Sequence, residues 1–130
     1  MDYRSKVLAS LTYIEQNLDD KISLDALAGT VHLSKYHYHR LFHKIAGESV
    51  SKYINKRRME KASEELVQTE QPIIDIALKY QYGSQEAFSR AFRQIYGLTP
   101  GRYRRTYTAG TRSKVISQGL YLGKTMNIAA

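Results

Sequence analysis

All four histidines of the 130-residue chain lie between residues 32 and 43, and this density first raises the question of a metal or catalytic site. His39 and His43 are one helical turn apart and could share a zinc ion, which takes four ligands or three ligands and a water. The chain has no cysteine, and no carboxylate lies in the same segment. A catalytic base also needs a nucleophile or a substrate pocket, which an exposed helix face does not supply. We therefore predict no metal site, no cofactor and no enzymatic activity.

The segment that carries three of these histidines recurs fifty residues later in the chain. SKYHYHRLFHKIAG at 34–47 aligns with SQEAFSRAFRQIYG at 84–97, and the two copies share a serine, an arginine, a phenylalanine, an isoleucine and a glycine but no histidine. The helical patterns that precede the copies also pair, through the apolar residues Leu24, Leu27 and Ala28 and Ile73, Ile76 and Ala77. The sequence therefore predicts a helix, a short turn and a second helix ending at glycine, present twice.

In each copy, helical spacing separates an apolar face from a polar face. The apolar faces, which we expect to be buried, consist of Tyr38, Leu41, Phe42 and Ile45 and of Phe88, Ala91, Phe92 and Ile95. The polar faces, about 200° round the helix at 3.6 residues per turn, consist of Tyr36, His39, Arg40 and His43 and of Glu86, Ser89, Arg90 and Arg93. An upstream helix is expected to bury Val7, Leu8, Leu11, Ile14 and Leu18. One buried face and one polar face are what a helix-turn-helix requires of the helix that enters the major groove of DNA.

Positive charge is concentrated on the same segments. The chain has 20 Lys and Arg against 12 Asp and Glu, a net charge of +8, and residues 34–47, 84–107 and 108–130 carry +3, +4 and +3. Separate basic patches favour a nucleic-acid partner, although a solvated basic face would have the same composition. No apolar run is long enough to span a membrane, and the first ten residues lack the hydrophobic stretch of a signal peptide. We expect a soluble, cytoplasmic protein without membrane contact.

A segment without glycine or proline joins the two copies, and its apolar residues keep helical spacing. A helix over residues 51–68 would extend about 27 Å at 1.5 Å per residue, which approaches the roughly 34 Å between successive major-groove faces on one side of DNA. We predict a first helix-turn-helix unit at 5–50, a connecting helix at 51–68 and a second unit at 69–107, so that a monomer could reach adjacent grooves. Residues 108–130 are expected to form a tail or linker, and one strand or the start of an effector domain are open alternatives.

Together these features resemble the DNA-binding domain of the AraC family of transcription regulators. The resemblance covers about residues 5–107 and rests on the paired units and on KRRMEKA at 56–62, IALKYQYGSQEAFSRAFRQIYG at 76–97 and LTPGRYRR at 98–105. It implies an all-α fold of about seven helices, in which helices near 36–46 and 85–96 read bases. Many family members have glycine in the tight turn of each unit, where this chain has His32 and Gln81. If those turns are left-handed, each side chain costs about 1 kcal/mol relative to glycine.

The resemblance also implies which positions contact DNA. The family's base-contacting positions fall on Tyr36, His39 and Arg40 in the first unit and on Gln85, Glu86, Ser89 and Arg90 in the second. Their chemistry fits this role, because arginine can donate two hydrogen bonds to guanine, glutamine suits adenine, and glutamate can accept from cytosine. Phosphate contacts, which position a protein without reading sequence, are assigned to Ser34, Lys35, Lys52, Arg93 and Arg102.

We predict a sequence-specific DNA-binding transcription regulator that places two recognition helices in adjacent major grooves of double-stranded DNA. The alternative is a helical protein-interaction adaptor whose repeated units dock a partner without contacting DNA, and an enzyme is a third reading that rests only on the histidines. The acidic side chains of the connecting helix are expected to form its solvated outer face, at Glu60, Glu64 and Glu65. A contact with RNA polymerase on this face stays an open alternative without support in the sequence.

Overall fold

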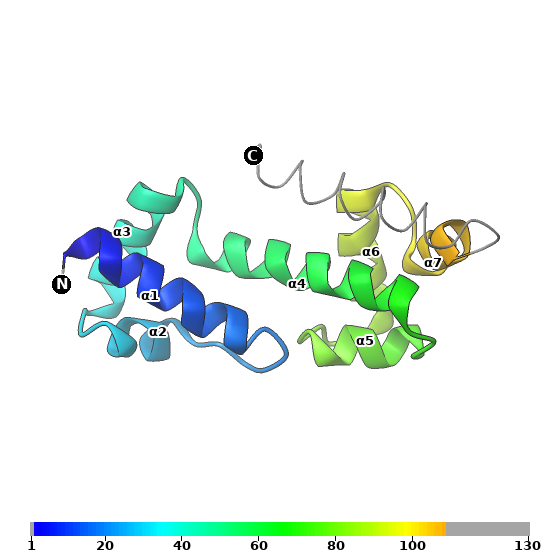
Figure 1. The fold of residues 1–130 in the computed structure, drawn as a ribbon, viewed down its shortest axis with the longest axis horizontal. Coiled ribbons are helices and arrows are strands. Elements are labelled where there is room, and N and C mark those ends of the chain that lie inside the picture. Colours follow the sequence, from blue (N-terminus) through cyan, green and yellow to red (C-terminus); the bar gives the residue numbers. More distant parts are fainter. Residues whose placement is uncertain (1, 109–130) are drawn as a thin grey trace. The chain divides into compact units, whose positions relative to one another are not determined.

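The computed structural model describes residues 2–108, in which the chain forms seven α-helices and no strand (Figure 1). The helices are α1 (Tyr3–Gln16), α2 (Leu24–Thr30), α3 (Lys35–Ala46), α4 (Val50–Gln68), α5 (Ile73–Lys79), α6 (Gln85–Tyr96) and α7 (Pro100–Thr108). The predicted all-α fold with two helix-turn-helix subdomains and about seven helices is confirmed. Thr108 ends α7, and the rest of the predicted tail, with its strand or effector-domain alternatives, lies outside the described residues.

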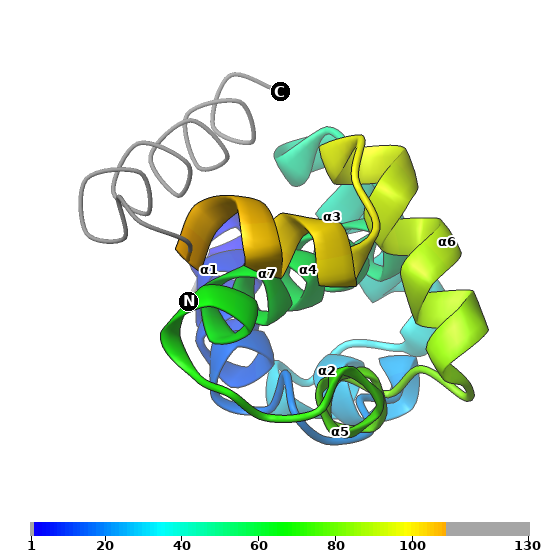
Figure 2. The ribbon, with the colours of Figure 1, turned by 90° about the vertical axis from the view of Figure 1, so that its right-hand side faces the viewer.

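The described part of the chain divides within α4, between Arg57 and Arg58, into two compact units. In the first unit α1, α2 and α3 contact one another (Figure 1), and in the second unit α6 contacts both α5 and α7 (Figure 2). α4 runs without interruption from Val50 to Gln68 and supplies buried residues on both sides of the division, Val50 and Ile54 before it and Met59, Ala62, Leu66 and Val67 after it.

The equivalent helices α3 and α6 begin and end in the same way. Ser34 and Ser84 are their N-caps, and each serine oxygen accepts a hydrogen bond from the amide three residues on, at 3.1 Å in both helices. Gly47 and Gly97 end the helices with φ of +81° and +77°, a left-handed conformation that glycine adopts without steric cost. These shared caps give both helices the same length of twelve residues.

The turns before these helices contain left-handed residues that are not glycine. His32 has φ of +59° and Gln81 has φ of +72°. In both turns the amide of the following residue reaches back to the preceding short helix, from Leu33 to the Ala28 carbonyl and from Tyr82 to the Ala77 carbonyl, at 3.0 Å each. Both turns are therefore left-handed, and the steric cost of a side chain relative to glycine applies at His32 and at Gln81.

Replacing His32 with glycine is expected to raise the free energy of unfolding by about 0.5 to 1 kcal/mol, because the left-handed strain is relieved and the imidazole is exposed to solvent. The more flexible unfolded chain offsets part of this gain. Urea unfolding followed by circular dichroism measures the change. His32→Ala keeps a Cβ in the left-handed turn and is the matched control. A gain from alanine as large as that from glycine would contradict the strain argument.

Aromatic side chains fill the core beneath both equivalent helices. Tyr38 and Phe42 of α3 and Phe88 and Phe92 of α6 are all fully buried. The two cores differ in polarity, because the Tyr38 hydroxyl donates a 2.8 Å hydrogen bond to Ser10 Oγ, whereas the equivalent Phe88 has no hydroxyl.

The prediction that Leu8 and Ile95 belong to the core is wrong. Leu8 is 55% exposed and Ile95 is 44% exposed. Helical spacing predicts which side of a helix turns inward but not how far the neighbouring helices extend along it.

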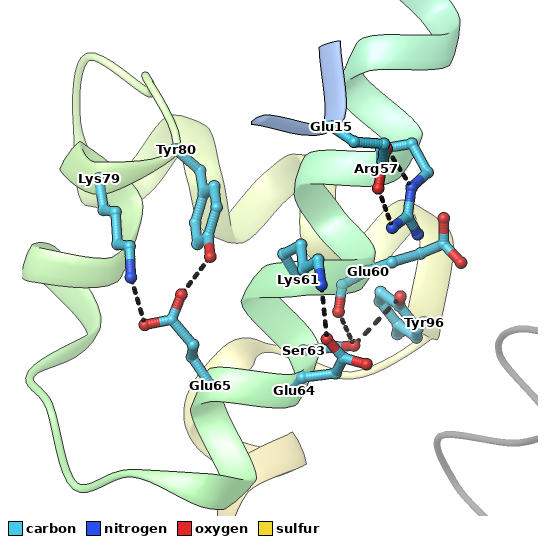
Figure 3. Close-up of polar contacts among 10 residues, drawn as sticks. All are labelled: Glu15, Arg57, Glu60, Lys61, Ser63, Glu64, Glu65, Lys79, Tyr80 and Tyr96. Atoms are coloured by element: carbon cyan, nitrogen blue, oxygen red, sulfur yellow. Dashed lines mark hydrogen bonds and ion pairs between the residues drawn. The ribbon is translucent and has the colours of Figure 1, made fainter. Parts of the chain in front are cut away.

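The acidic side chains of α4 are not the solvated outer face that the sequence suggested (Figure 3). Glu65 accepts hydrogen bonds from Lys79 Nζ at 3.0 Å and from the Tyr80 hydroxyl, which join α4 to α5. Glu60 is only 8% exposed, and Glu64 lies 3.9 Å from Lys61 Nζ. Lys79 and Tyr80 lie outside α4, so the helical pattern of α4 alone could not reveal the partners of Glu65, whereas Lys61 lies within α4, three residues before Glu64.

Candidate nucleic-acid interface

The polar face of α3 is exposed to solvent. Tyr36 is 70% exposed, and His39 and Arg40 are exposed beside it. The Arg40 guanidinium carbon lies 5.5 Å from the centre of the Tyr36 ring, a cation–π arrangement between residues one helical turn apart. The predicted base-contacting set of the first unit therefore shares one accessible face, and two of its members are in direct contact.

The polar face of α6 carries a different set of groups at the equivalent positions. Gln85, Glu86 and Arg90 are exposed, and Ser89 is half-buried. Glu86 stands where α3 has Tyr36, so Arg90 has no aromatic ring one turn before it on which to stack. The two helices thus share a position for arginine but differ in the hydrogen-bonding groups around it, and they would prefer different bases.

Three of the predicted phosphate-contacting residues lie in the first turn of a helix. Lys35 follows the Ser34 cap of α3, and Lys52 and Arg102 occupy equivalent positions at the starts of α4 and α7. The amide of Lys52 donates to Ser49 Oγ at 3.2 Å, and the amide of Arg102 donates to Thr99 Oγ1 at 3.4 Å. Helix starts carry a positive partial charge that favours anions, and these two basic side chains add to it.

The other two predicted phosphate contacts are Ser34, the N-cap of α3, and Arg93, within α6. Ser34 Oγ already accepts a hydrogen bond from the His37 amide at 3.1 Å, so only its hydroxyl proton is available to a phosphate. Arg93 is exposed in the last turn of α6. Not every basic residue nearby is available: Arg104 donates 2.7 Å hydrogen bonds to the carbonyls of Leu66 and Gln71 and so holds α7 against the end of α4. The net charge of +4 counted for residues 84–107 includes Arg104, although this arginine is engaged in holding the fold.

Tyrosines pack behind α6 and bring a titratable group into the core. Tyr103 is 4% exposed, and burial, together with the neighbouring Tyr96 and Tyr107, raises its pKa to about 12 from the ordinary value of 10. Its ring lies 5.2 Å from that of Phe92 in an edge-on arrangement. The packing that supports α6 therefore depends on a neutral Tyr103.

Stability is expected to fall as the pH rises from about 10 to 12. The unfolded chain loses the Tyr103 proton near its ordinary pKa, whereas the folded chain keeps it until about 12. The contribution of this group, about 2 to 3 kcal/mol, is fully present below pH 10 and is lost as the pH passes through the folded pKa. Urea midpoints at pH 9.5 and 11.5 measure the loss. Tyr103→Phe should show a smaller fall than wild type, and an identical fall in both proteins would disprove this assignment.

One neighbour of the interface was not predicted from the sequence. The ring of Tyr3, in the first turn of α1, meets the ring of His37 edge-on at 5.3 Å. The two residues are far apart in the sequence, and no spacing pattern connects them. His37 is exposed although its ring makes this contact.

Residues 2–108 hold neither a metal-binding cluster nor a membrane-spanning helix. Within residues 2–108, no three His, Asp or Glu side chains lie together in a group that could hold a metal ion. In that range no helix combines the length and the apolar character needed to cross a membrane.

Comparison with known proteins identifies the fold and the family. A family model described as a helix-turn-helix domain matches residues 27–106. The chain is 44% identical over 95 residues to the transposon Tn10 TetD protein of Escherichia coli, covering 73% of this chain and 69% of that protein. It is 43% identical over 104 residues to YbfP of Bacillus subtilis, an uncharacterized HTH-type transcriptional regulator, covering 80% of this chain but only 35% of that protein.

A solved structure agrees with these relatives. A transcriptional regulator from Chromobacterium violaceum, described as an AraC-type DNA-binding domain-containing protein, matches with a TM-score of 0.74 at 29% identity and covers 82% of this chain and 96% of that one. The resemblance inferred from the repeated units is confirmed. The chain belongs to the AraC-type helix-turn-helix family.

Proposed function

We propose that this chain is a transcription regulator that binds double-stranded DNA sequence-specifically through α3 and α6. The observation that carries the proposal is the equivalence of these two helices: each is twelve residues long, capped by serine and glycine, and places an exposed arginine opposite a buried aromatic pair. Arginine can donate two parallel hydrogen bonds to guanine O6 and N7 in the major groove. In this proposal Arg40 and Arg90 are the principal base-reading residues.

The other site residues divide by their chemistry between bases and phosphates. Tyr36 and His39 would complete base contacts from α3, and Gln85, Glu86 and Ser89 would do so from α6. Phosphates on either side of the helices would be bound by Ser34, Lys35, Lys52, Arg93 and Arg102. The exposure of the lysines and arginines in both sets supports this division, as does the location of Lys52 and Arg102 at helix starts.

The chain is proposed to act as a monomer with its recognition helices in adjacent major grooves. Both helices belong to one chain, and the units 5–50 and 69–107 are joined by α4, whose 19 residues correspond to about 28 Å. This length is of the same order as the roughly 34 Å that separates successive groove faces. A cytoplasmic location is part of this proposal.

A contact with RNA polymerase would follow from binding beside a promoter. The acidic side chains of α4 are poorly suited to it, because Glu65 is bonded to Lys79 and Tyr80 and Glu60 is buried. Such a contact would therefore use another surface.

Selection of binding sites from a random duplex library tests the proposed function. The expected result is a recurring sequence with two short conserved blocks about one helical turn apart. Salt titration on the selected site should give a steep, linear fall of log affinity with log salt, because bound phosphates release counterions. No enrichment together with a flat salt dependence would refute DNA binding and revive the protein-interaction adaptor.

A further inference from the structure

A pocket of about 280 Å³ opens beside the polar face of α3, at the first turn of α1. It is lined by Tyr3, His37, Arg40, Leu41 and Lys44. The edge-on contact of Tyr3 with His37, at 5.3 Å between ring centres, lies within this lining. The pocket therefore joins two helices of the first unit at a place next to a proposed base-reading residue.

The lining combines nitrogen donors with an apolar wall. His37, Arg40 and Lys44 all carry side-chain N–H groups, and Leu41 and the ring of Tyr3 supply apolar surface. No acidic side chain lines the pocket, and within residues 2–108 none of the three nitrogen-bearing side chains forms an ion pair. Arg40 also stacks on Tyr36, so it stands at the border between the pocket and the base-reading face. An anionic group with an apolar part attached matches this composition.

We propose that the pocket binds one sugar-phosphate unit of the DNA strand that flanks the first recognition helix. The phosphodiester lies against Lys44, His37 and the near side of Arg40, and the deoxyribose packs on Leu41 and Tyr3. This inference rests on the proposed DNA binding. Free inorganic phosphate shares the anionic chemistry but leaves Leu41 and Tyr3 without a partner, so the composition of the pocket favours the DNA backbone.

The second unit does not repeat this composition. Its equivalents of His37, Leu41 and Lys44 are Ala87, Ala91 and Gln94, and only the arginine is kept, as Arg90. A backbone contact of this kind would therefore belong to the first unit alone. It would anchor α3 to one DNA strand through His37 and Lys44, which are not among its base contacts.

Lys44→Gln tests the inference, because it places at this position the residue that the second unit already has. Binding to the selected site and to random duplex is measured between 0.05 and 0.3 M salt. Losing one phosphate contact should weaken binding about fivefold at 0.1 M salt on both DNAs and reduce the slope of log affinity against log salt by about 0.9. Tyr3→Ala, which removes the apolar wall, should also weaken both complexes. Thermal unfolding of each variant verifies that the fold is kept.

Lys21→Gln is the matched control, since Lys21 is exposed in the connection after α1, at the opposite end of that helix from Tyr3. This variant removes the same charge and should keep the wild-type slope. If Lys44→Gln binds like wild type, the pocket assignment is wrong while DNA binding stands; if wild type itself shows no salt-dependent binding, both proposals fail. Exchanging chloride for inorganic phosphate at constant ionic strength separates the two anions. Displacement of DNA from wild type but not from Lys44→Gln would show that free phosphate and the DNA backbone compete for the pocket, as proposed, whereas saturable phosphate binding that leaves the DNA affinity of wild type unchanged would overturn the backbone assignment.

Discussion

Phe92→Ala is expected to lower the free energy of unfolding by about 3 to 5 kcal/mol, the largest effect of any substitution considered for this chain. Phe92 is fully buried, and its ring centre lies 5.8 Å from Phe88, 4.6 Å from Tyr96 and 5.2 Å from Tyr103. Removing the ring leaves a cavity and also ends the three aromatic contacts. Urea unfolding monitored by circular dichroism measures the loss.

Two further variants make this test specific. Ile95→Ala removes an apolar side chain from the same helix, but Ile95 is 44% exposed, so its loss should stay below about 1 kcal/mol. Phe42→Ala is the equivalent change in the first unit, where two rings among residues 2–108 meet Phe42, Tyr38 at 5.9 Å and Tyr53 at 5.8 Å. It should cost somewhat less than Phe92→Ala. If Phe92→Ala and Ile95→Ala cost the same, α6 is not held by the aromatic cluster described above.

The sequence contained most of the information about the elements themselves. Serine before and glycine after each of the two recognition helices, with apolar residues at helical spacing between them, are local signals that depend on neighbours a few residues away. The internal repeat strengthened them, because a pattern present twice at a fixed offset is unlikely to arise from composition alone. For the turns at His32 and Gln81 the family resemblance raised the question of a left-handed residue, by comparison with the glycine of other members, and left it open; the structure has a positive φ at both positions.

What could not be predicted depends on which elements lie side by side. Leu8 and Ile95 keep helical spacing with their neighbours, but no other helix covers them sufficiently. Glu65 was expected in solvent, yet its carboxylate accepts hydrogen bonds from Lys79, the last residue of α5, and from Tyr80, the C-cap of that helix. The pocket beside α3 needs Tyr3, whose place next to His37 is a tertiary contact. Periodicity describes one helix at a time, and these features each require two.

Arg40→Ala and Arg90→Ala are each expected to weaken binding to the selected site by about 1 to 3 kcal/mol and to relax the preference at one base position. The loss on random duplex should be smaller, because a bidentate contact to guanine is made only at the correct base. Repeating the site selection with each variant shows which position has lost its preference. Arg93→Ala, assigned to a phosphate, should instead weaken selected and random DNA alike. Equal losses on both DNAs for Arg40→Ala and Arg90→Ala would refute base reading by these arginines.

The surroundings of the two arginines predict a difference between them. Arg40 stacks on Tyr36 at 5.5 Å, so Tyr36→Ala should reduce the effect of a subsequent Arg40→Ala, with a coupling of about 0.5 to 1 kcal/mol in a double-mutant cycle. Glu86 occupies the equivalent position before Arg90 and offers no ring. The cycle between Glu86 and Arg90 should therefore lack a cation–π component, and a coupling equal to that of Tyr36 with Arg40 would contradict the stacking argument.

Combining Arg40→Ala with Arg90→Ala tests whether one chain uses both recognition helices at one site. The two residues belong to separate compact units, so their effects should add to within about 0.5 kcal/mol if each contacts its own groove. The double variant would then lose about 2 to 6 kcal/mol, which brings its affinity down to that for random DNA. If only one unit engages the site, the arginine of the other unit should have no effect alone, and the double variant should equal the active single variant. Additivity thus separates a monomer spanning adjacent grooves from a chain that binds through one helix, without requiring the structure of the complex.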